Sequence, residues 1–382
     1  MNRALRILFW ADEFYPMVGG LETWAYELTH QLVENGHQVL VVANKNNDAF
    51  ADTEEINGLL LRRYPIWKVL AKQNAGDLIR LAHKIHNDVH RFEANCIHLN
   101  TCSVSAVVYL LSLVRLDIPV LMTLHGRWPE TATRKYSILN KTIESANRVA
   151  CVSKSVENWI ADCFPDQSSK LLTLPNAITH KVPPPTDTLI TRSLVLVARL
   201  SWEKGVDLAL RAFKLVLNLV PEAHLDIAGD GLDRALLEEL SVELGVNNAV
   251  RFLGWVTPEN INQLMQQSKV VLIPSREEGF GLVALEAAMA VRPVVAFRTG
   301  GLAEIVQHEK TGLLIPPEDI GSMANGIIAL LDQPDLASRM GLAAQIHVEE
   351  CYSWDAHVGR YEQNYYQLLE SKKLVCNHEG DS

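Results

Sequence analysis

Paired cysteines are absent from this sequence of 382 residues. Its six cysteines are scattered, and no two of them form a C-x-x-C pair. Zinc sites and disulfide frameworks both require regularly spaced cysteines, so the sequence predicts neither of them, and a reducing compartment suits it best. Because no other cluster of metal-ligating side chains stands out, we expect no bound metal.

Long hydrophobic runs are also missing. The most apolar stretch, Val104 to Val114, is about 11 residues long and contains serines, whereas a membrane-spanning helix needs about 20 apolar residues. The N-terminus begins like a signal peptide, but Asp12 and Glu13 follow its short apolar part and no small-residue cleavage pattern is visible. We interpret this part as a buried first strand and expect a cytoplasmic protein.

Positive charge is in short supply, with 35 Lys and Arg against 45 Asp and Glu and a net charge of −10. This balance argues against a protein that binds nucleic acid through bulk positive charge, so we expect no nucleic-acid partner. Apolar residues make up 48% and charged residues 21%, as in soluble globular proteins. At this length the chain exceeds a single hydrophobic core, and two domains of about 150–200 residues each are expected.

Short β-branched runs alternate with longer amphipathic stretches, which is typical of parallel α/β architecture. The first series of candidate strands comprises Leu5–Trp10, Gln38–Ala43, Cys96–Asn100, Pro119–Leu124, Arg148–Val152 and Leu171–Leu174. The second series comprises Leu194–Arg199, His224–Ala228, Val250–Leu253, Val270–Ile273, Val294–Phe297 and Gly312–Ile315. Several runs are apolar throughout, as expected for strands covered on both faces.

Three consecutive prolines, Pro183 to Pro185, separate the two series. Such a run favours a stiff extended connector, because proline fits neither a helix interior nor a central strand. We therefore expect a Rossmann-like domain over residues 1–180, a linker over 181–192 and a second Rossmann-like domain over 193–352. Ligands of open parallel sheets bind beyond the carboxyl ends of the strands, so functional residues should directly follow strands.

Two adjacent glycines, Gly19 and Gly20, stand between the first candidate strand and a helical pattern, in the segment F-Y-P-M-V-G-G-L-E. Glycines at a helix entrance allow close approach of the backbone and present free N–H groups to an anion. A tight strand-to-helix turn explains them equally well.

Two cations flank the loop that follows the first strand of the second series, in A-R-L-S-W-E-K-G-V-D. Arg199 ends the strand, Lys204 comes five residues later, and Gly205 and a helix follow. Fixed cations around such a loop suit a diphosphate. Two solvated surface cations are the alternative, but the position at the carboxyl end of a strand favours a functional role.

A carboxylate pair, Glu278 and Glu286, brackets the start of an apolar, alanine-rich helix that is expected from Leu282 onward. The turn Gly279–Gly281 precedes this helix. Helical rise separates the two carboxylates by about 12 Å along the axis, close to the span from a sugar to a ribose across a diphosphate. The helix N-terminus between them favours negative charge, and a carboxylate on an apolar helix face requires a partner.

Together, the motifs P-x-x-G-G-x-E, R-L-x-x-x-K-G and E-G-F-G-L-x-x-L-E-A-x-A resemble those of glycosyltransferase family 4. This resemblance covers nearly the whole chain. It implies retaining, nucleotide-sugar-dependent enzymes of the GT-B fold, in which two doubly wound α/β domains face a central cleft. It also implies that the first domain serves the acceptor, that the second binds the donor, and that a C-terminal helix over 353–370 crosses back to the first domain.

The resemblance assigns roles to individual positions. It places Glu278 beside the donor sugar, Glu286 at the ribose, and the basic pair at the diphosphate. Weaker matches add a histidine loop after the strand Pro119–Leu124 and donor loops after Val250–Leu253 and Val294–Phe297. The implied catalytic residues are Glu278, His125, Arg199 and Lys204. The implied donor-binding residues are Gly19, Gly20, Arg199, Lys204, Val256, Glu278, Gly279, Phe280, Gly281, Leu282, Glu286 and Thr299.

One departure is visible near the end of the first domain, where the family often has N-G-V-D and this chain has Asn176-Ala177-Ile178-Thr179. The missing glycine and aspartate remove any specific role at that position. The segment Gly229-Asp230-Gly231 imitates a dinucleotide fingerprint, but Arg234 occupies the third glycine position. No nicotinamide cofactor is therefore expected.

The resemblance implies a hexosyltransferase that moves a sugar from a nucleoside-diphosphate sugar to an acceptor hydroxyl with retention. UDP is the expected carrier because it is the commonest one in the family. No cofactor or metal is expected, since cations and a helix N-terminus replace the metal in stabilising the leaving group. A sugar-nucleotide 2-epimerase of the same fold and a catalytically silent glycosyltransferase-like partner are the alternatives.

A basic segment, residues 62–91, lies outside these motifs and holds seven Lys and Arg against two Asp. Within it, apolar residues from Leu78 to Phe92 recur with helical spacing and predict an amphipathic helix. Its polar side would carry His83, His86, His90, Arg80, Lys84 and Arg91. We favour a solvated face; a peripheral contact with a membrane surface or the acceptor is the alternative. His86 and His90 have a spacing that suits zinc, but no third ligand is evident.

Overall fold

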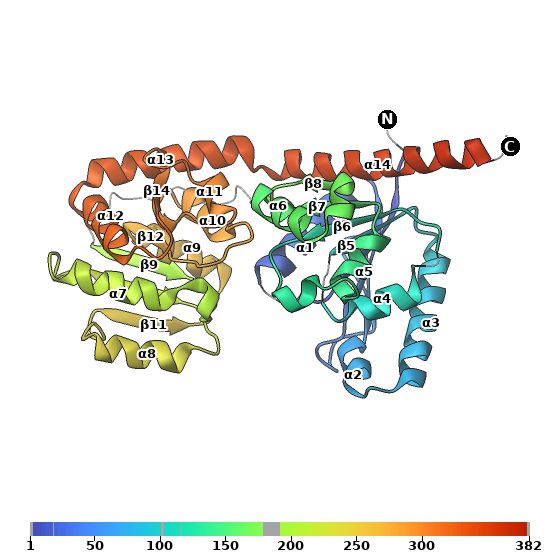
Figure 1. Ribbon diagram of the computed structural model, residues 1–382, viewed down its shortest axis with the longest axis horizontal. Helices are drawn as coiled ribbons and strands as arrows, with labels where there is room; N and C mark the ends of the chain where they lie inside the picture. Colours follow the sequence, from blue (N-terminus) through green and yellow to red (C-terminus); the bar gives the residue numbers. More distant parts are fainter. Residues whose placement is uncertain (1–2, 18, 101–102, 115, 179–191, 380–382) are drawn as a thin grey trace. The chain divides into compact units, whose positions relative to one another are not determined.

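The computed structural model describes residues 3–17, 19–100, 103–114, 116–178 and 192–379 (Figure 1). The triple proline and most of the expected linker lie outside these ranges. The chain divides into two compact units, the first comprising Met1–Pro175 with Asp355–Ser382 and the second Asn176–Trp354. Each unit is a parallel α/β sheet with helices, as the alternation of strands and helices predicts.

The first unit has an eight-stranded sheet in the order β3-β4-β2-β1-β5-β6-β7-β8, parallel except for β3. Its strands are β1 Arg6–Ala11, β2 Gln38–Asn44, β3 Thr53–Ile56, β4 Leu59–Tyr64, β5 Cys96–Asn100, β6 Val120–Leu124, β7 Arg148–Cys151 and β8 Leu171–Thr173. Its α-helices are α1 Gly20–Glu34, α2 Ile66–Ala71, α3 Ala75–Phe92, α4 Ala106–Ser112, α5 Ile138–Ser145, α6 Lys154–Cys163 and, in all but its first residue, α14 Trp354–Glu379. Short 3₁₀ turns occupy Glu130–Thr133 and Pro165–Lys170.

The second unit has a six-stranded parallel sheet in the order β11-β10-β9-β12-β13-β14. Its strands are β9 Ser193–Val197, β10 His224–Ala228, β11 Val250–Gly254, β12 Val270–Ile273, β13 Val294–Phe297 and β14 Gly312–Ile315. Its helices are α7 Val206–Leu217, α8 Arg234–Glu243, α9 Pro258–Gln267, α10 Leu282–Met289, α11 Leu302–Ile305, α12 Ile320–Asp332 and α13 Pro334–Cys351, with a 3₁₀ turn at Trp202–Lys204. All twelve strands expected from the sequence are present, with ends shifted by at most two residues.

The β3–β4 hairpin was not predicted. Its turn residues Asn57 and Gly58 have positive φ values of 49° and 80°, as tight hairpin turns require. The Asn-Gly pair is the sequence signal for this turn, but the acidic residues of β3 lack the apolar alternation of a strand. The hairpin adds the antiparallel edge strand β3 and places part of the basic segment, Arg62 and Arg63, in β4.

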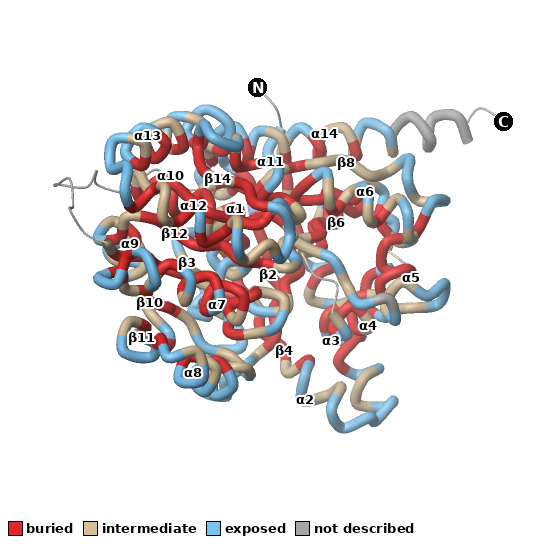
Figure 2. Tube along the Cα trace, turned by 60° about the vertical axis from the view of Figure 1, so that its left-hand side comes forward, coloured by how far each residue is buried: buried red, intermediate tan, exposed pale blue. Residues whose placement is uncertain are grey.

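Local sequence features set the ends of the amphipathic helix α3. The Asn74 side chain accepts a hydrogen bond from the Asp77 N–H and caps the helix N-terminus. Its buried residues Leu81, Ala82, Ile85 and Val89 match the predicted apolar face. Across the molecule the central strands are buried while outward helix surfaces are exposed (Figure 2), which is how parallel sheets covered on both faces bury their apolar runs.

Helix α14 completes the first unit with a buried polar network. The His98 ring on β5 contacts the Tyr365 hydroxyl at 2.6 Å and the Thr123 hydroxyl of β6 at 2.8 Å. The Tyr361 hydroxyl lies 3.2 Å from that same threonine oxygen. Buried polar groups are tolerated when they satisfy one another, so α14 contributes core residues of the first unit.

Candidate functional site

The candidate donor residues of the second unit follow the carboxyl ends of its strands, where open parallel sheets bind ligands. Strands β9 and β12 are direct neighbours, with Val270 paired to Leu194. The loop after β9 carries Arg199 and Lys204, and the loop after β12 carries Glu278. Sheet topology therefore brings together two motifs that lie more than 70 residues apart in the sequence.

Lys204 and Glu278 form an ion pair within this site. The Lys204 Nζ lies 2.8 Å from the Glu278 Oε2, and the exposed fractions of the two side chains are 20% and 16%. The Ser275 hydroxyl donates a hydrogen bond of 3.2 Å to the same carboxylate oxygen. The structure thus joins the predicted phosphate-binding lysine and the predicted sugar-binding glutamate in one contact.

Arg199 lies on the same loop but is far more accessible, with 72% of its side chain exposed. The sequence predicted Arg199 at the end of the strand, but β9 ends at Val197, two residues earlier. The Arg199 Nη2 is 3.5 Å from the Glu203 Oε1, and the Ser201 hydroxyl donates to that oxygen at 2.6 Å. The guanidinium is therefore loosely held and open to solvent.

The loop after β13 packs tightly against the loop that carries Glu278. A Cβ atom on Gly300, whose φ is 49°, would lie 1.6 Å from the backbone oxygen of Glu278. The Gly301 N–H donates to that oxygen at 3.2 Å, and the Thr299 hydroxyl donates to the Ser275 carbonyl at 3.0 Å. Only glycine fits at residue 300, because both its φ and its surroundings exclude a side chain.

Helix α10 begins at Leu282, as predicted, and Gly281 precedes it with φ 108°. The Phe280 side chain is buried and packs edge-on against Tyr352. Glu286 is exposed on a helix whose other residues are buried or half-buried, and its carboxylate makes no hydrogen bond or ion pair with the side chains that the structure describes. Desolvation by the surrounding protein raises the pKa of this carboxyl group. It is a free acceptor for hydroxyl groups.

One of the two predicted donor loops follows β11. This strand ends at Gly254, whose carbonyl accepts the Gly229 N–H at 2.8 Å. Val256 is half-buried, whereas 62% of the Trp255 surface is exposed. Trp255 is therefore a surface aromatic.

His125 of the first unit directly follows β6, as predicted. Its Nε2 lies 2.6 Å from the Asn100 Oδ1, an acceptor, so Nε2 carries the proton. Its Nδ1 is buried and has no hydrogen-bond partner among the described residues. Burial, followed by repulsion from His357, lowers the pKa of His125 to about 3. The ring is therefore neutral and offers a lone pair, so it can accept a hydrogen bond from a hydroxyl.

The glycine pair lies at the start of α1, where Gly20 is the first helical residue and Gly19 the N-cap. The φ of Gly19 is −172°, an extended value that any residue adopts. A Cβ atom there would lie 2.2 Å from the Glu22 carboxylate. Because this carboxylate ends a flexible side chain that can move aside, neither the backbone conformation nor this contact requires glycine at residue 19.

Several residues in or next to these loops were not predicted. Ser275 and Arg276 precede Glu278 in the motif, Asp207 follows Lys204 by three residues, and Asn100 ends β5. Asn100 is the last residue of its strand, and Ser275 and Arg276 lie two and three residues beyond the end of β12. Asp207 instead lies in the first turn of α7. Placement at or just after a strand end is the signal that could have identified the other three.

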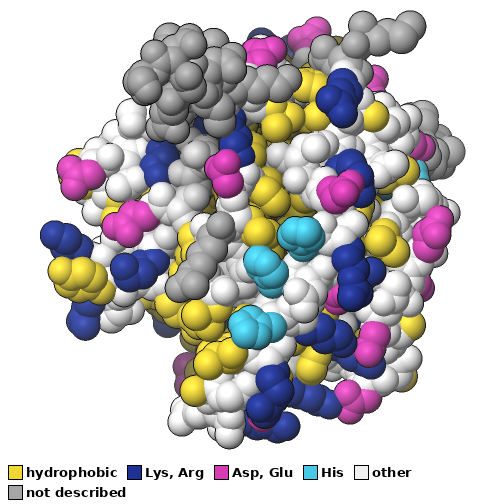
Figure 3. Space-filling model, turned by 90° about the vertical axis from the view of Figure 1, so that its right-hand side faces the viewer, with side chains coloured by type: hydrophobic (Ala, Val, Ile, Leu, Met, Phe, Trp, Pro, Cys, Tyr) yellow, Lys and Arg dark blue, Asp and Glu magenta, His cyan; other side chains and the backbone are white. Residues whose placement is uncertain are grey.

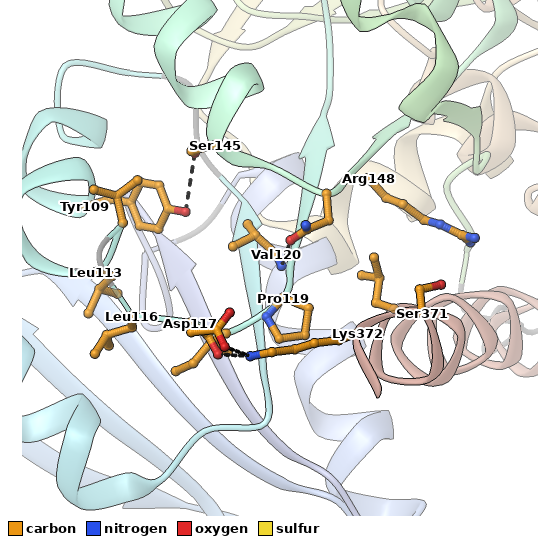
Figure 4. Close-up of a pocket in the computed structure, with 14 residues that line it drawn as sticks. Tyr109, Leu113, Leu116, Asp117, Pro119, Val120, Ser145, Arg148, Ser371 and Lys372 are labelled. Atoms are coloured by element: carbon orange, nitrogen blue, oxygen red, sulfur yellow. Dashed lines mark hydrogen bonds and ion pairs between the residues drawn. The ribbon is translucent and has the colours of Figure 1, made fainter. Parts of the chain in front are cut away.

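A hollow in another part of the first unit has a volume of about 520 Å³ (Figure 4). It adjoins Val120 and Arg148, the first residues of β6 and β7, and so lies at the amino ends of the strands. Its charged groups are already paired: Lys372 with Asp117 at 2.7 Å, and Arg148 with Asn364 at 2.6 Å. This hollow therefore carries no candidate donor residue.

The basic segment is largely neutralised by acidic neighbours. Arg62 and Arg91 both contact Asp88, at 2.8 and 3.7 Å, and Arg63 contacts Glu54 at 2.7 Å. Histidines gather beside Lys and Arg on this side of the first unit (Figure 3). His86 is only half-buried on the polar side and its Nδ1 lies 2.8 Å from the Ser112 carbonyl. Among the described residues no group of His, Cys, Asp and Glu could hold a metal ion, and none of the helices there is long and apolar enough to span a bilayer.

Comparisons with known proteins identify the family of this chain. The family models for "Glycosyltransferase Family 4" and "Glycosyl transferases group 1" match residues 18–182 and 191–347. An uncharacterized glycosyltransferase of Methanocaldococcus jannaschii is 28% identical, covering 93% of this chain and 96% of its own.

Solved structures share the fold. Sucrose-phosphate synthase from Thermosynechococcus elongatus superposes with a TM-score of 0.82 at 23% identity, covering 96% of this chain and 99% of its own. HepE of Anabaena, solved in complex with UDP and glucose, has a TM-score of 0.76 at 19% identity, covering 95% and 100%. The chain therefore belongs to glycosyltransferase family 4 and has the GT-B fold.

Proposed function

We propose that this protein is a retaining hexosyltransferase that transfers a sugar from a nucleoside-diphosphate sugar, with UDP as the carrier, to an acceptor hydroxyl. The observation that carries the proposal is the Lys204–Glu278 ion pair, with Arg199 on the same loop as Lys204, at the carboxyl ends of neighbouring strands. The second unit would bind the donor and the first the acceptor. HepE, of the same fold, was solved with UDP and glucose, which supports UDP as the carrier.

The difficult step is departure of the nucleoside diphosphate from an oxocarbenium-like sugar. Arg199, Lys204 and the N-terminus of α10 would stabilise the negative charge that develops on the phosphate, which is electrostatic catalysis. Because these groups supply the positive charge, the reaction would need no metal ion. Glu278 and the exposed Glu286 would hold hydroxyl groups of the sugar and the ribose.

His125 would lie beside the transferred sugar, with its Nε2 held by Asn100 and its Nδ1 buried within the first unit. A neutral ring suits this role, because a cation close to the oxocarbenium-like centre would oppose its positive charge. Gly19 and Gly20 would admit the donor close to the backbone at the start of α1.

The test is incubation of the protein with a panel of nucleotide sugars, followed by measurement of nucleoside diphosphate release with and without acceptor extracts. Release that depends on acceptor, with an unchanged anomeric configuration in the product, is expected. An isomerised donor in the absence of acceptor would identify a 2-epimerase instead. Absence of nucleotide binding would point to a silent partner protein.

A further inference from the structure

The Arg276 side chain connects the two loops that hold Lys204 and Glu278. Its Nη1 donates to the Trp202 carbonyl and to the Asp207 Oδ1, and its Nη2 donates to the Asp207 Oδ2, each at 2.8 Å. Trp202 and Asp207 lie on either side of Lys204, at the 3₁₀ turn and in the first turn of α7. Arg276 itself is two residues before Glu278.

Backbone contacts reinforce this connection. The Glu203 carbonyl accepts hydrogen bonds from the N–H groups of Arg276 and Glu277, at 2.9 and 3.2 Å. Gly205, with φ 63°, packs so closely that a Cβ atom would lie 2.0 Å from the Pro274 carbonyl oxygen. The two loops thus form one packed layer, which the Arg276 side chain spans in addition to the Lys204–Glu278 ion pair.

The guanidinium of Arg276 is occupied by the protein. Only 11% of its side chain is exposed, the Trp202 ring lies 5.1 Å from its centre, and Glu318 approaches its Nε at 3.5 Å. Burial acts to raise the pKa of Asp207, but the hydrogen bonds and charge of Arg276 outweigh it and lower that pKa. The pair therefore stays ionised, and Arg276 is poorly placed to bind a phosphate itself.

We propose that Arg276 is a positioning residue of the donor site, which fixes the Lys204 loop against the Glu278 loop and so sets the position of the Lys204 ammonium for the donor phosphates. This inference rests on the proposed function. A planar, bidentate fork is the geometry that makes arginine better than lysine at such a site, and Arg276–Asp207 has that geometry.

The experiment is a double-mutant cycle on nucleotide affinity, measured by calorimetry. Wild type is first titrated with UDP, GDP and ADP, and the tightest binder becomes the probe. Arg276→Gln and Lys204→Ala should each weaken binding about tenfold, the loss of one charge-assisted contact. Adding Arg276→Gln to the Lys204→Ala protein should change affinity less than about threefold, because Arg276 acts through Lys204.

Two further variants serve as references. Arg276→Lys keeps the charge but loses the fork, so it should restore only part of the affinity. Arg251→Gln removes another bidentate pair of the same unit, in which Arg251 contacts Asp226 twice at 2.6 Å. It should leave nucleotide affinity unchanged, while thermal unfolding of both proteins reports the cost to stability. If Arg276→Gln fails to fold, Asp207→Asn takes its place in the cycle.

The outcomes separate the two proposals. The positioning role would be overturned if Arg276→Gln reduced nucleotide affinity equally in the wild-type and Lys204→Ala backgrounds, or reduced it in neither. The proposed donor site would stand in both cases. Wild-type affinity in Lys204→Ala, or failure of all three nucleotides to bind, would overturn the proposed function and with it this inference.

Discussion

Trp24 donates its indole N–H to the Nε2 of His357, 333 residues further along the chain, at 3.0 Å. The other ring nitrogen of His357 lies 2.7 Å from the Pro175 carbonyl, so Nδ1 carries the proton and the ring is neutral. Burial lowers the pKa of His357 to about 3 and also lowers those of His98 and His125. Three neutral histidines thus surround Trp24 in the first unit.

This cluster predicts acid sensitivity of the first unit. In the unfolded chain these histidines bind protons near pH 6.5, whereas in the folded unit they stay neutral to a much lower pH. Their contribution to the free energy of unfolding is therefore complete above pH 6.5 and is lost as the pH falls toward 3. For His357 alone, the loss reaches about 3 kcal/mol by pH 4.5. Urea unfolding at several pH values measures it. His357→Gln should flatten the dependence, whereas exposed His83→Gln should preserve it; equal slopes in all three proteins would contradict the prediction.

Removal of either cation at the candidate donor site should depress turnover. Arg199→Ala and Lys204→Ala each remove a contact that stabilises phosphate charge, worth about 2–4 kcal/mol in the transition state. This corresponds to a decrease in kcat of about 30-fold or more. Steady-state kinetics with the best donor provides the measurement, and near-normal kcat in both variants would show that the site is misassigned.

Chelation of divalent ions should leave activity intact, because the charge on the leaving group is balanced by side chains and a helix N-terminus. Diphosphate release is measured before and after dialysis against EDTA. A loss of activity that magnesium or manganese restores would show that a metal carries out this part of the reaction.

Gly300→Ala should strongly destabilise the second unit. The new methyl group would overlap the Glu278 carbonyl, and the φ of 49° is itself unfavourable for alanine. Gly359→Ala is the matched control, since no atom lies within 4 Å of that position in helix α14, and alanine there should stabilise by about 0.5–1 kcal/mol. Thermal unfolding compares the two, and a Gly300→Ala protein with wild-type Tm would refute the close packing of these loops.

Replacing Arg80, Lys84 and Arg91 together with Gln should not change vesicle binding. Arg80 pairs with Asp77, Arg91 pairs with Asp88, and Lys84 lies over the Tyr64 ring. Free charges would each contribute about 1 kcal/mol of attraction to an anionic surface. Sedimentation with anionic vesicles at low and moderate salt compares wild type and the triple variant. Binding by the wild type alone would establish a membrane-facing patch.

The sequence predicted the parallel sheets well because their apolar runs are long and uninterrupted, as in Val270–Ile273. It missed both β3 and β4. Charged edge residues such as Glu54 and Glu55 show no apolar alternation in β3, and the apolar start of β4 runs directly into Arg62 and Arg63. The resemblance to the family assigned Lys204 and Glu278 separate roles, Lys204 at the phosphates and Glu278 at the sugar. Their ion pair was not predicted, since it depends on β9 and β12 being neighbours.

Contacts between distant side chains were the least predictable part of the site. The bidentate pairing of Arg276 with Asp207 joins charged residues that a linear pattern assigns to a solvated surface. The neutral state of His125 likewise depends on burial and on His357, which lies in a different part of the sequence. Periodicity reports which face of an element is apolar, but it carries no information about which polar groups meet.

The return of α14 to the first unit has a consequence for synthesis on the ribosome. Residues up to Pro175 emerge first, yet Trp24, His98 and Thr123 gain their contacts with α14 only after residues 176–354 have been translated. The second unit is continuous in sequence and can complete its core as soon as it emerges. The part of the protein that is made first is therefore the last to mature, and a nascent chain stalled before residue 355 exposes an unfinished core to chaperones.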